Sequence, residues 1–112
     1  MERNLDGVRR TPAGDWDRAN LLFDAGDYIA AARTLGGLVA DHPERNGPRL
    51  LLARAYYHSA QLGRAEAELR TLLDRDPGDG YAHLLLGRAL ERQGRGSEAA
   101  PYLKVAEVWG VV

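Results

Sequence analysis

The feature that most constrains the fold of this chain is an internal repeat with a step of 34 residues. Pro43 and Pro77 stand one step apart, and each follows a stretch with helical spacing. The same step relates six further series of equivalent residues: Ala19, Ala53 and Gly87; Gly26, Ala60 and Gly94; Ala31, Ala65 and Ala99; Leu22, Tyr56 and Leu90; Leu35, Leu69 and Leu103; Leu38, Leu72 and Ala106. Series that stay in phase over three units indicate a tandem array of one structural unit.

Each unit has the pattern of a helical hairpin. In the second unit, apolar residues at 51, 52, 55 and 56 mark one helix face, and those at 65, 69, 72 and 73 mark another. The small residues of the repeated series let two antiparallel helices approach closely, and the large residues fill the space between them. The spacing predicts helices near residues 13–25, 28–41, 47–59, 62–75, 80–93 and 97–109.

The predicted organisation is a single all-α domain over residues 13–112, with units at about 12–45, 46–79 and 80–112. A chain of 112 residues has the length of one ordinary domain. Residues 1–12 lie outside the repeats and combine Gly7 and Pro12 with mixed charges, so we expect a flexible arm. The alternative for this arm is a segment that docks on a neighbouring molecule.

Local signals predict how individual helices begin and where a helix is weakened. Asn46 or Gly47 is expected to cap the third helix, and Asp79 the fifth. Gly36 and Gly37 fall inside the second helix, where each costs about 1 kcal/mol relative to alanine. We expect that a neighbouring helix packs closely against this pair, or that the helix is bent there.

The residues of the second and third units resemble a known repeat. The run Leu-Leu-Leu-Ala-Arg-Ala-Tyr at 50–56, followed by Ala65, Leu69 and Pro77, is similar to the tetratricopeptide repeat with its 34-residue step. The third unit matches at 86–87, 90, 94, 99 and 103, and the first has a weaker leading helix, with Arg18 where the family prefers leucine. The resemblance covers roughly residues 13–109. It implies a right-handed superhelical array of six helices that binds proteins.

The resemblance also implies where a partner binds, because the first helices of the units line the concave face in this family. The positions carried over are Trp16, Asn20, Phe23, Leu50, Arg54, Tyr57, His58, Tyr81, Leu84, Arg88 and Arg92. An arginine fork suits a carboxylate because two charge-assisted hydrogen bonds form together. The hypothesis is a groove for an extended or helical peptide with at least one acidic group. The alternative is that the arginines pair with neighbouring acids, as Arg88 could with Glu91 at i, i+3.

The end of the chain predicts a second contact surface. Apolar residues follow one another at helical spacing and continue to the last position: Tyr102, Val105, Val108, Trp109, Val111 and Val112. A terminal repeat usually needs a polar outer face or a capping helix. An apolar end therefore favours self-association, end to end or as a closed dimer. The alternatives are that Trp109 and the valines fold back onto the third unit, or that the chain continues in a longer protein.

Composition argues against several other function classes. The net charge of -1 is unlike that of nucleic-acid binders, and no apolar run is long enough for a membrane span. Cysteine is absent and the three histidines, at 42, 58 and 83, lie in different units, so we expect no metal and no cofactor. Ser59 and Ser97 sit in no nucleophile motif, so we expect no enzyme.

Three functions are compatible with these observations. The favoured one is a cytoplasmic adaptor that binds a protein or peptide in its groove, and the polar start of the chain, which lacks the apolar core of a signal peptide, favours that location. The first alternative is a structural module that assembles through its C-terminal end. The second is a regulatory subunit of an enzyme. A shared fold does not identify the partner.

Overall fold

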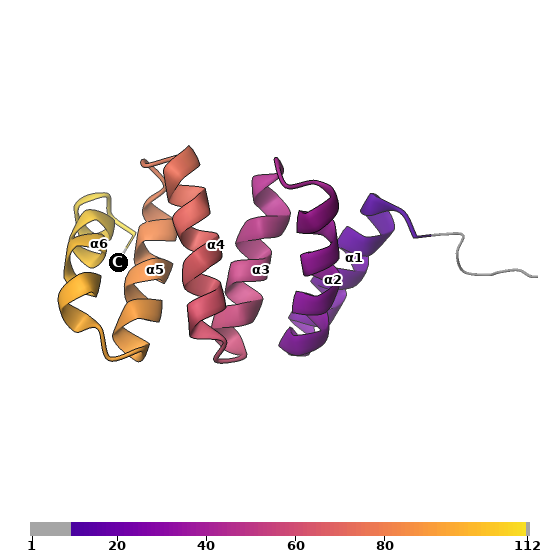
Figure 1. Cartoon of the computed structure of the whole chain (residues 1–112), viewed down its shortest axis with the longest axis horizontal. Helices are drawn as coiled ribbons and strands as arrows, with labels where there is room; N and C mark the ends of the chain where they lie inside the picture. Colours follow the sequence, from indigo (N-terminus) through magenta and orange to yellow (C-terminus); the bar gives the residue numbers. More distant parts are fainter. Residues whose placement is uncertain (1–9, 112) are drawn as a thin grey trace, which may run out of the picture.

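The computed structural model describes residues 10–111, and every regular element in that range is an α-helix (Figure 1). The helices are α1 (Pro12–Asp24), α2 (Tyr28–Asp41), α3 (Asn46–His58), α4 (Leu62–Arg75), α5 (Gly80–Arg92) and α6 (Gly96–Val108). The predicted all-α array of three helical hairpins is therefore confirmed, with each predicted helix displaced by one residue at most. The predicted arm at 1–12 lies mostly outside the described residues, and Pro12 is the first residue of α1.

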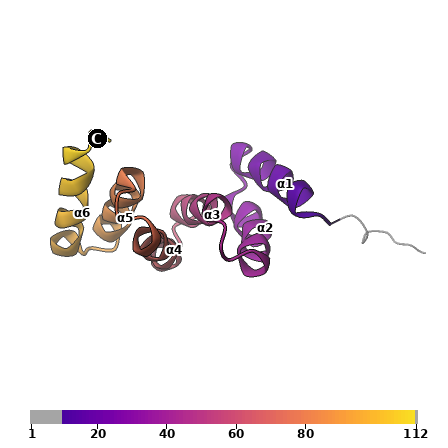
Figure 2. The same cartoon turned by 90° about the horizontal axis from the view of Figure 1, so that it is seen from above.

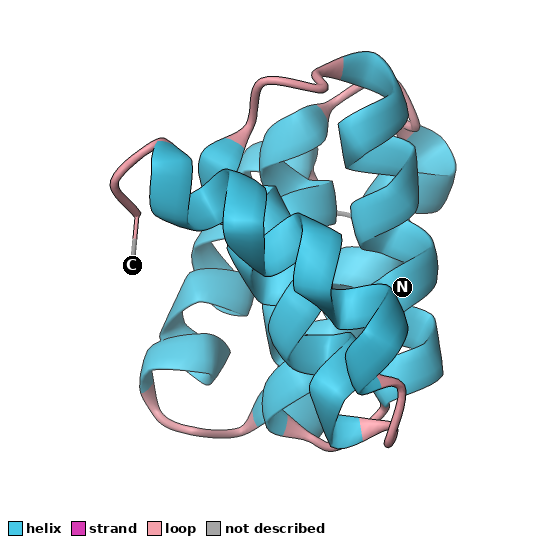
Figure 3. Cartoon of the chain, turned by 90° about the vertical axis from the view of Figure 1, so that its left-hand side faces the viewer, coloured by secondary structure: helices cyan, strands magenta, loops and turns pink. Residues whose placement is uncertain are grey.

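The helices follow one another in an elongated array with principal extents of 57 × 24 × 20 Å (Figure 1). Seen from above, α1, α3 and α5 lie towards one side and α2 and α4 towards the other (Figure 2). Viewed along the array, the described chain consists only of helices and the loops that join them (Figure 3). We call the side of α1, α3 and α5 the A-helix side, and the side of α2 and α4 the B-helix side.

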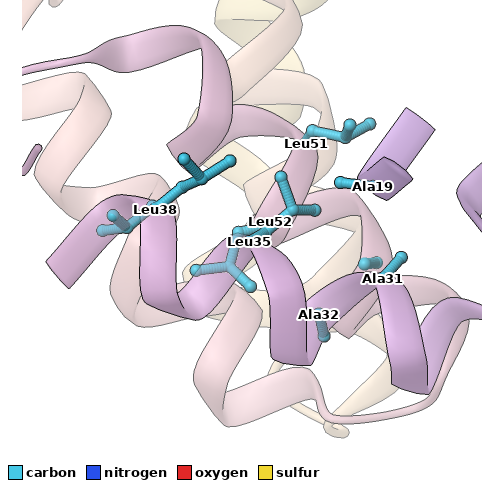
Figure 4. Close-up of a cluster of buried hydrophobic side chains, with 9 residues drawn as sticks. Ala19, Ala31, Ala32, Leu35, Leu38, Leu51 and Leu52 are labelled. Atoms are coloured by element: carbon cyan, nitrogen blue, oxygen red, sulfur yellow. The ribbon is translucent and has the colours of Figure 1, made fainter. Parts of the chain in front are cut away.

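The core is formed by the residues of the repeated series. One cluster joins α1, α2 and α3 and includes Ala19, Leu35 and Leu52 (Figure 4). A second cluster joins α3 to α6 and includes Leu69, Leu86 and Leu90. The small member of a series permits close packing: a Cβ at Gly87 would lie 2.5 Å from Leu103 Cδ2. Alternation of large and small positions therefore holds the hairpins together, as the sequence predicts.

Helix starts agree with the sequence at one predicted position and differ at another. The Asp79 side chain accepts a hydrogen bond from Ala82 N and caps α5, which confirms that prediction. The prediction that Asn46 or Gly47 caps α3 is wrong, because the cap position is Arg45 and carries no side-chain cap bond. Asn46 lies within the helix, and its Oδ1 accepts from Arg75 Nη1 at 2.9 Å. The carboxamide therefore joins α3 to the end of α4 instead of closing a helix end.

The turns within the three hairpins share one backbone conformation at equivalent positions. Gly26, Ala60 and Gly94 have φ values of +82°, +61° and +75°. The turn at Ala60 is closed by hydrogen bonds from Ala60 N to Tyr57 O and from Gln61 N to Tyr56 O. That pattern places a left-handed residue directly after the helix, where glycine is the usual occupant.

Ala60 is the one member of this series with a side chain, so Ala60→Gly should stabilise the protein. The left-handed conformation costs a non-glycine residue about 1 kcal/mol, which exceeds the extra entropy of glycine in the unfolded chain. The free energy of unfolding, measured by urea denaturation, should rise by roughly 0.5–1 kcal/mol. Gly94→Ala at the equivalent turn is the matched control and should lower it. Equal effects of the same sign would contradict this assignment.

The close-packing explanation for Gly36 and Gly37 is wrong. A Cβ built at either position meets no atom within 4 Å, and α2 is continuous from Tyr28 to Asp41. Gly36→Ala with Gly37→Ala should therefore raise the free energy of unfolding by roughly 1–2 kcal/mol, because alanine restricts the unfolded chain and favours helix. Thermal unfolding followed by circular dichroism measures this. A double variant less stable than the wild type would mean that these glycines have a packing role.

Candidate peptide-binding surface

The A-helix side carries a compact group of rings and guanidinium groups near the C-terminal ends of α1, α3 and α5. We call it the aromatic–arginine cluster; its members are Phe23, Tyr28, Arg54, Tyr57, His58 and Arg92. Five of them are sequence-predicted groove residues from three different units. The sixth, Tyr28, comes from the start of α2. The cluster thus gathers side chains that are up to two repeat steps apart in the sequence.

The rings of the cluster pack around His58. Its imidazole stacks on Tyr28 with the ring centroids 4.7 Å apart, and it meets Phe23 edge-on at 5.7 Å. Tyr57 approaches the same imidazole edge-on at 5.6 Å, and Phe23 and Tyr28 also contact each other at 5.1 Å. These geometries are the offset and edge-to-face arrangements that aromatic pairs favour. The packing holds the side chains in place before any partner binds.

Both arginines of the cluster lie over aromatic faces. The Arg54 guanidinium carbon is 4.7 Å from the centroid of Phe23, and that of Arg92 is 4.7 Å from the centroid of Tyr57. Arg92 Nη1 also donates to the Tyr57 carbonyl at 3.1 Å. Within residues 10–111 neither arginine pairs with a carboxylate, and the buried Nε of Arg54 has no hydrogen-bond partner. The cluster therefore carries positive charge that the described chain leaves without an acidic counterpart.

That charge changes the titration of His58. Partial burial among the rings, followed by the positive charges of Arg54 and Arg92, lowers the pKa of His58 below its ordinary value of 6.5. The imidazole is therefore neutral at pH 7. A neutral ring can stack against Tyr28 without adding a third positive charge to the cluster.

Other sequence-predicted groove residues lie outside the cluster. Trp16 and Tyr81 are 37% and 39% exposed near the N-terminal ends of α1 and α5. Asn20 Nδ2 donates to the Trp16 carbonyl. Leu50 and Leu84 are half-buried, and Leu50 packs on the second core cluster. Arg88 pairs with Glu91 at 3.3 Å, which is the alternative that its spacing allowed.

Tyr28 is a cluster member that sequence reasoning missed. It belongs to a second helix, whereas the resemblance places the groove on first helices. The repeat does not predict an aromatic residue at this position either, because the equivalent residues are Leu62 and Gly96. Its only signal is an aromatic residue beside the turn at Gly26, which brings the start of α2 next to the end of α1.

The C-terminal residues predicted for self-association differ in their exposure. Tyr102 packs on the second core cluster, and its hydroxyl accepts from Arg70 Nη1 at 2.9 Å. Trp109 and Val111 fold back onto the start of α5, where Trp109 meets the His83 ring edge-on at 5.4 Å. Val105 is half-buried, whereas Val108, Trp109 and Val111 are 69%, 48% and 38% exposed. Val112 lies outside the described residues.

Two general features complete the description of residues 10–111. No group of three or more histidine, aspartate and glutamate side chains comes together there in a way that could hold a metal ion. None of the helices in that range combines the length and apolarity that a membrane span requires.

Comparison with solved structures supports the fold. One mutant form of MamA superposes with a TM-score of 0.81 at 21% identity, over 86% of this chain and 70% of that one. Another mutant form of MamA gives a TM-score of 0.84 at 20% identity, over 89% of this chain and 55% of that one. MamA 41-end from Desulfovibrio magneticus RS-1 gives 0.75 at 26% identity, over 83% of this chain and 53% of that one. The chain thus spans little more than half of two of these relatives.

Comparison with family models identifies the repeat. No curated protein matches the chain as a relative. The family model described as tetratricopeptide repeat matches residues 22–89 and 61–107, which together cover most of the array. The matched residues contain α2 to α5 entirely and nearly all of α6. With three helical hairpins in a 34-residue step, the chain belongs to the tetratricopeptide repeat family.

Proposed function

We propose that this chain is a cytoplasmic adaptor whose A-helix side binds a peptide segment of a partner protein through an acidic group. The tetratricopeptide fold is in general a scaffold for protein–protein interaction. The observation that supports an acidic ligand is the pair Arg54 and Arg92, which pack on rings without a carboxylate partner in residues 10–111. Stacking on an aromatic face holds a guanidinium group in one orientation, so less entropy is lost when it binds.

The remaining cluster residues suit the rest of such a ligand. Phe23, Tyr28 and Tyr57 offer apolar ring surface beside the charges, and aromatic residues contribute large contact area at low entropic cost. Both guanidinium groups lie close enough to His58 to lower its pKa, so one carboxylate placed beside His58 would feel both charges. The ligand expected is therefore an acidic side chain, or a chain terminus, next to apolar residues.

Selection of peptides from a random display library on the immobilised protein tests this function. The selected sequences should be enriched in aspartate, glutamate or a free C-terminus beside an aliphatic or aromatic residue. A parallel selection on Arg54→Glu with Arg92→Glu should no longer return these sequences. Selected peptides without an acidic group, or the same peptides from both proteins, would overturn the assignment of the cluster.

Binding should strengthen as the pH falls through the titration of His58. A carboxylate bound beside the imidazole stabilises its protonated form, so the pKa of His58 is higher in the complex than in the free protein, where it lies below 6.5. Protons are therefore taken up on binding, and affinity should increase roughly fivefold between about pH 7 and pH 5. Isothermal titration calorimetry measures this, and His58→Gln should make the profile flat. Affinity that falls over this range would contradict the account.

One comparison within the chain supports self-assembly as a second candidate function. Leu35 and Leu69 are fully buried by the following unit, whereas Leu103 at the equivalent position is only half-buried. A groove of about 390 Å³ lies beside Leu103, between α5 and α6. At the other end, Leu21 is 71% exposed although its equivalents Ala55 and Ala89 are fully buried.

Mass in solution tests this second function. End-to-end stacking would cover Leu103 of one molecule with α1 of the next, so the mass should grow with concentration. Leu21→Glu with Val108→Lys places charges on the two exposed ends and should return the protein to a monomer. A wild type that stays monomeric at high concentration would exclude self-assembly and leave the adaptor function unaffected.

A further inference from the structure

The B-helix side contains a cavity that the proposed function does not use. It has a volume of about 240 Å³ and lies at the junction of the first and second units. Its lining comes from α2, the end of α3 and the start of α4: Ile29, Ala32, Arg33, Tyr56, Gln61 and Arg64. None of these six residues belongs to the aromatic–arginine cluster. The cavity is thus a separate feature of the array.

The equivalent place at the next junction is filled by a carboxylate. One repeat step relates Ala32 to Glu66 and Gln61 to Arg95. The two Glu66 oxygens accept from Arg95 Nη1 at 2.7 Å and from Arg95 Nη2 at 3.1 Å, a bidentate pair. The Glu66 side chain is 14% exposed, and hydrogen bonds led by that from Arg95 lower its pKa from 4.5 to about 2. The second junction therefore shows how this architecture holds a carboxylate.

At the first junction neither member of this ion pair is present, because Ala32 replaces Glu66 and Gln61 replaces Arg95, but two other arginines line the cavity. Ala32 has no acidic group, and Arg64 stands where the second junction has Glu98. Arg64 Nη1 donates to Gln61 Oε1 at 2.8 Å, which holds the guanidinium against the cavity wall. Arg33 adds a second guanidinium to the lining. Within residues 10–111 neither arginine pairs with an acid, so the cavity is positively charged and has the room that a Glu66-like side chain would need.

We propose that this cavity binds the carboxylate of an acidic side chain from a peptide, in the position that Glu66 occupies at the next junction. Arg33 and Arg64 pair with the carboxylate, and the Gln61 amide lies beside it. Ile29 is 60% exposed at the cavity and supplies apolar contact for the residue next to the acid. The cavity shares no residue with the aromatic–arginine cluster, so one molecule can bind an acidic group at each of the two sites.

The test uses two capped peptides, acetyl-Leu-Glu-Leu-amide and its Gln counterpart. Each is titrated into the 112-residue chain with Arg54→Glu and Arg92→Glu, so that the other site is disabled. Backbone amide NMR shifts report binding. The Glu peptide should shift the amides of Ile29, Gln61 and Arg64 and bind at least roughly tenfold more tightly than the Gln peptide. Equal binding of the two peptides, or no shifts at these residues, would overturn the proposal.

Two variants separate occupancy of the cavity from general charge. Ala32→Glu supplies an internal carboxylate, so it should raise the melting temperature and abolish the peptide shifts. Arg64→Gln keeps the cavity and removes one cation, and it should weaken the Glu peptide roughly tenfold without affecting the Gln peptide. Unchanged binding by either folded variant would overturn the site. Glutarate serves as a free carboxylate for comparison. If it binds as tightly as the Glu peptide, the cavity does not select a peptide side chain, and that part of the proposal is overturned.

Discussion

Replacement of Leu69 by alanine should lower the free energy of unfolding by about 2–5 kcal/mol. Leu69 is fully buried in the second core cluster, where residues of α3, α4, α5 and α6 meet. The substitution removes its packing within the second unit and against the third, and leaves a cavity that the rigid helices cannot close. A typical domain has a free energy of unfolding of about 5–15 kcal/mol, so the expected loss is a large share of it. Urea unfolding followed by circular dichroism measures the loss.

Leu103→Ala is the matched control for this prediction. Leu103 occupies the same position one repeat later, where no further unit in the described chain covers it and the side chain is only half-buried. Its loss should cost roughly 1–2 kcal/mol, because less surface is removed from contact. Equal costs for the two substitutions, or a cost below about 1 kcal/mol for Leu69→Ala, would show that the units do not stabilise one another through these leucines.

Reversing both charges of the aromatic–arginine cluster should have the largest effect on binding. Arg54→Glu with Arg92→Glu is expected to weaken the binding of an acidic peptide by more than about 100-fold, because each charge-assisted hydrogen bond contributes roughly 1.5–3 kcal/mol and the new carboxylates add repulsion. The variant also loses the guanidinium contacts with Phe23 and Tyr57, so the free energy of unfolding should fall by roughly 1–2 kcal/mol while the protein stays folded. Fluorescence anisotropy of a labelled peptide from the library selection measures the affinity.

A control with the same change in net charge separates local contact from overall repulsion. Arg45→Glu with Lys104→Glu alters two exposed positions, one in the turn before α3 and one on α6. It should leave the affinity within about threefold of the wild type, because charges on the surface are screened beyond about 10 Å. A loss as large as that of the cluster variant would mean that the two cluster arginines do not contact the acid.

The fold was predictable because each unit must satisfy the same packing. Leu35 and Leu69 occupy equivalent buried positions, so the same residue type recurs there. The 34-residue step is therefore visible in the sequence. Helix ends were predictable to one residue for the same reason, since the turns at Gly26 and Gly94 share a conformation. The residues that recur in every unit are those that each unit needs for its packing and its turn.

The details of the site were less predictable because they lie where the units differ. Tyr28 has no aromatic equivalent in the other units, so its stacking on His58 depends on one turn in three dimensions. Arg54 and Arg88 occupy equivalent positions, yet only Arg88 has an acid one helical turn away, at Glu91. At the C-terminal end, helical spacing could not show that Trp109 turns back towards the start of α5. Such outcomes depend on neighbours that a single periodic pattern does not specify.

The most direct test of the central claim is a map of the footprint that an acidic peptide from the library selection leaves on the protein, measured by NMR. The account predicts the largest shifts for Phe23, Tyr57 and His58 and for the side-chain Nε–H groups of Arg54 and Arg92, with α6 unaffected. A footprint centred on the C-terminal end of the array, with these resonances unchanged, would contradict it and place the interaction surface elsewhere on the molecule.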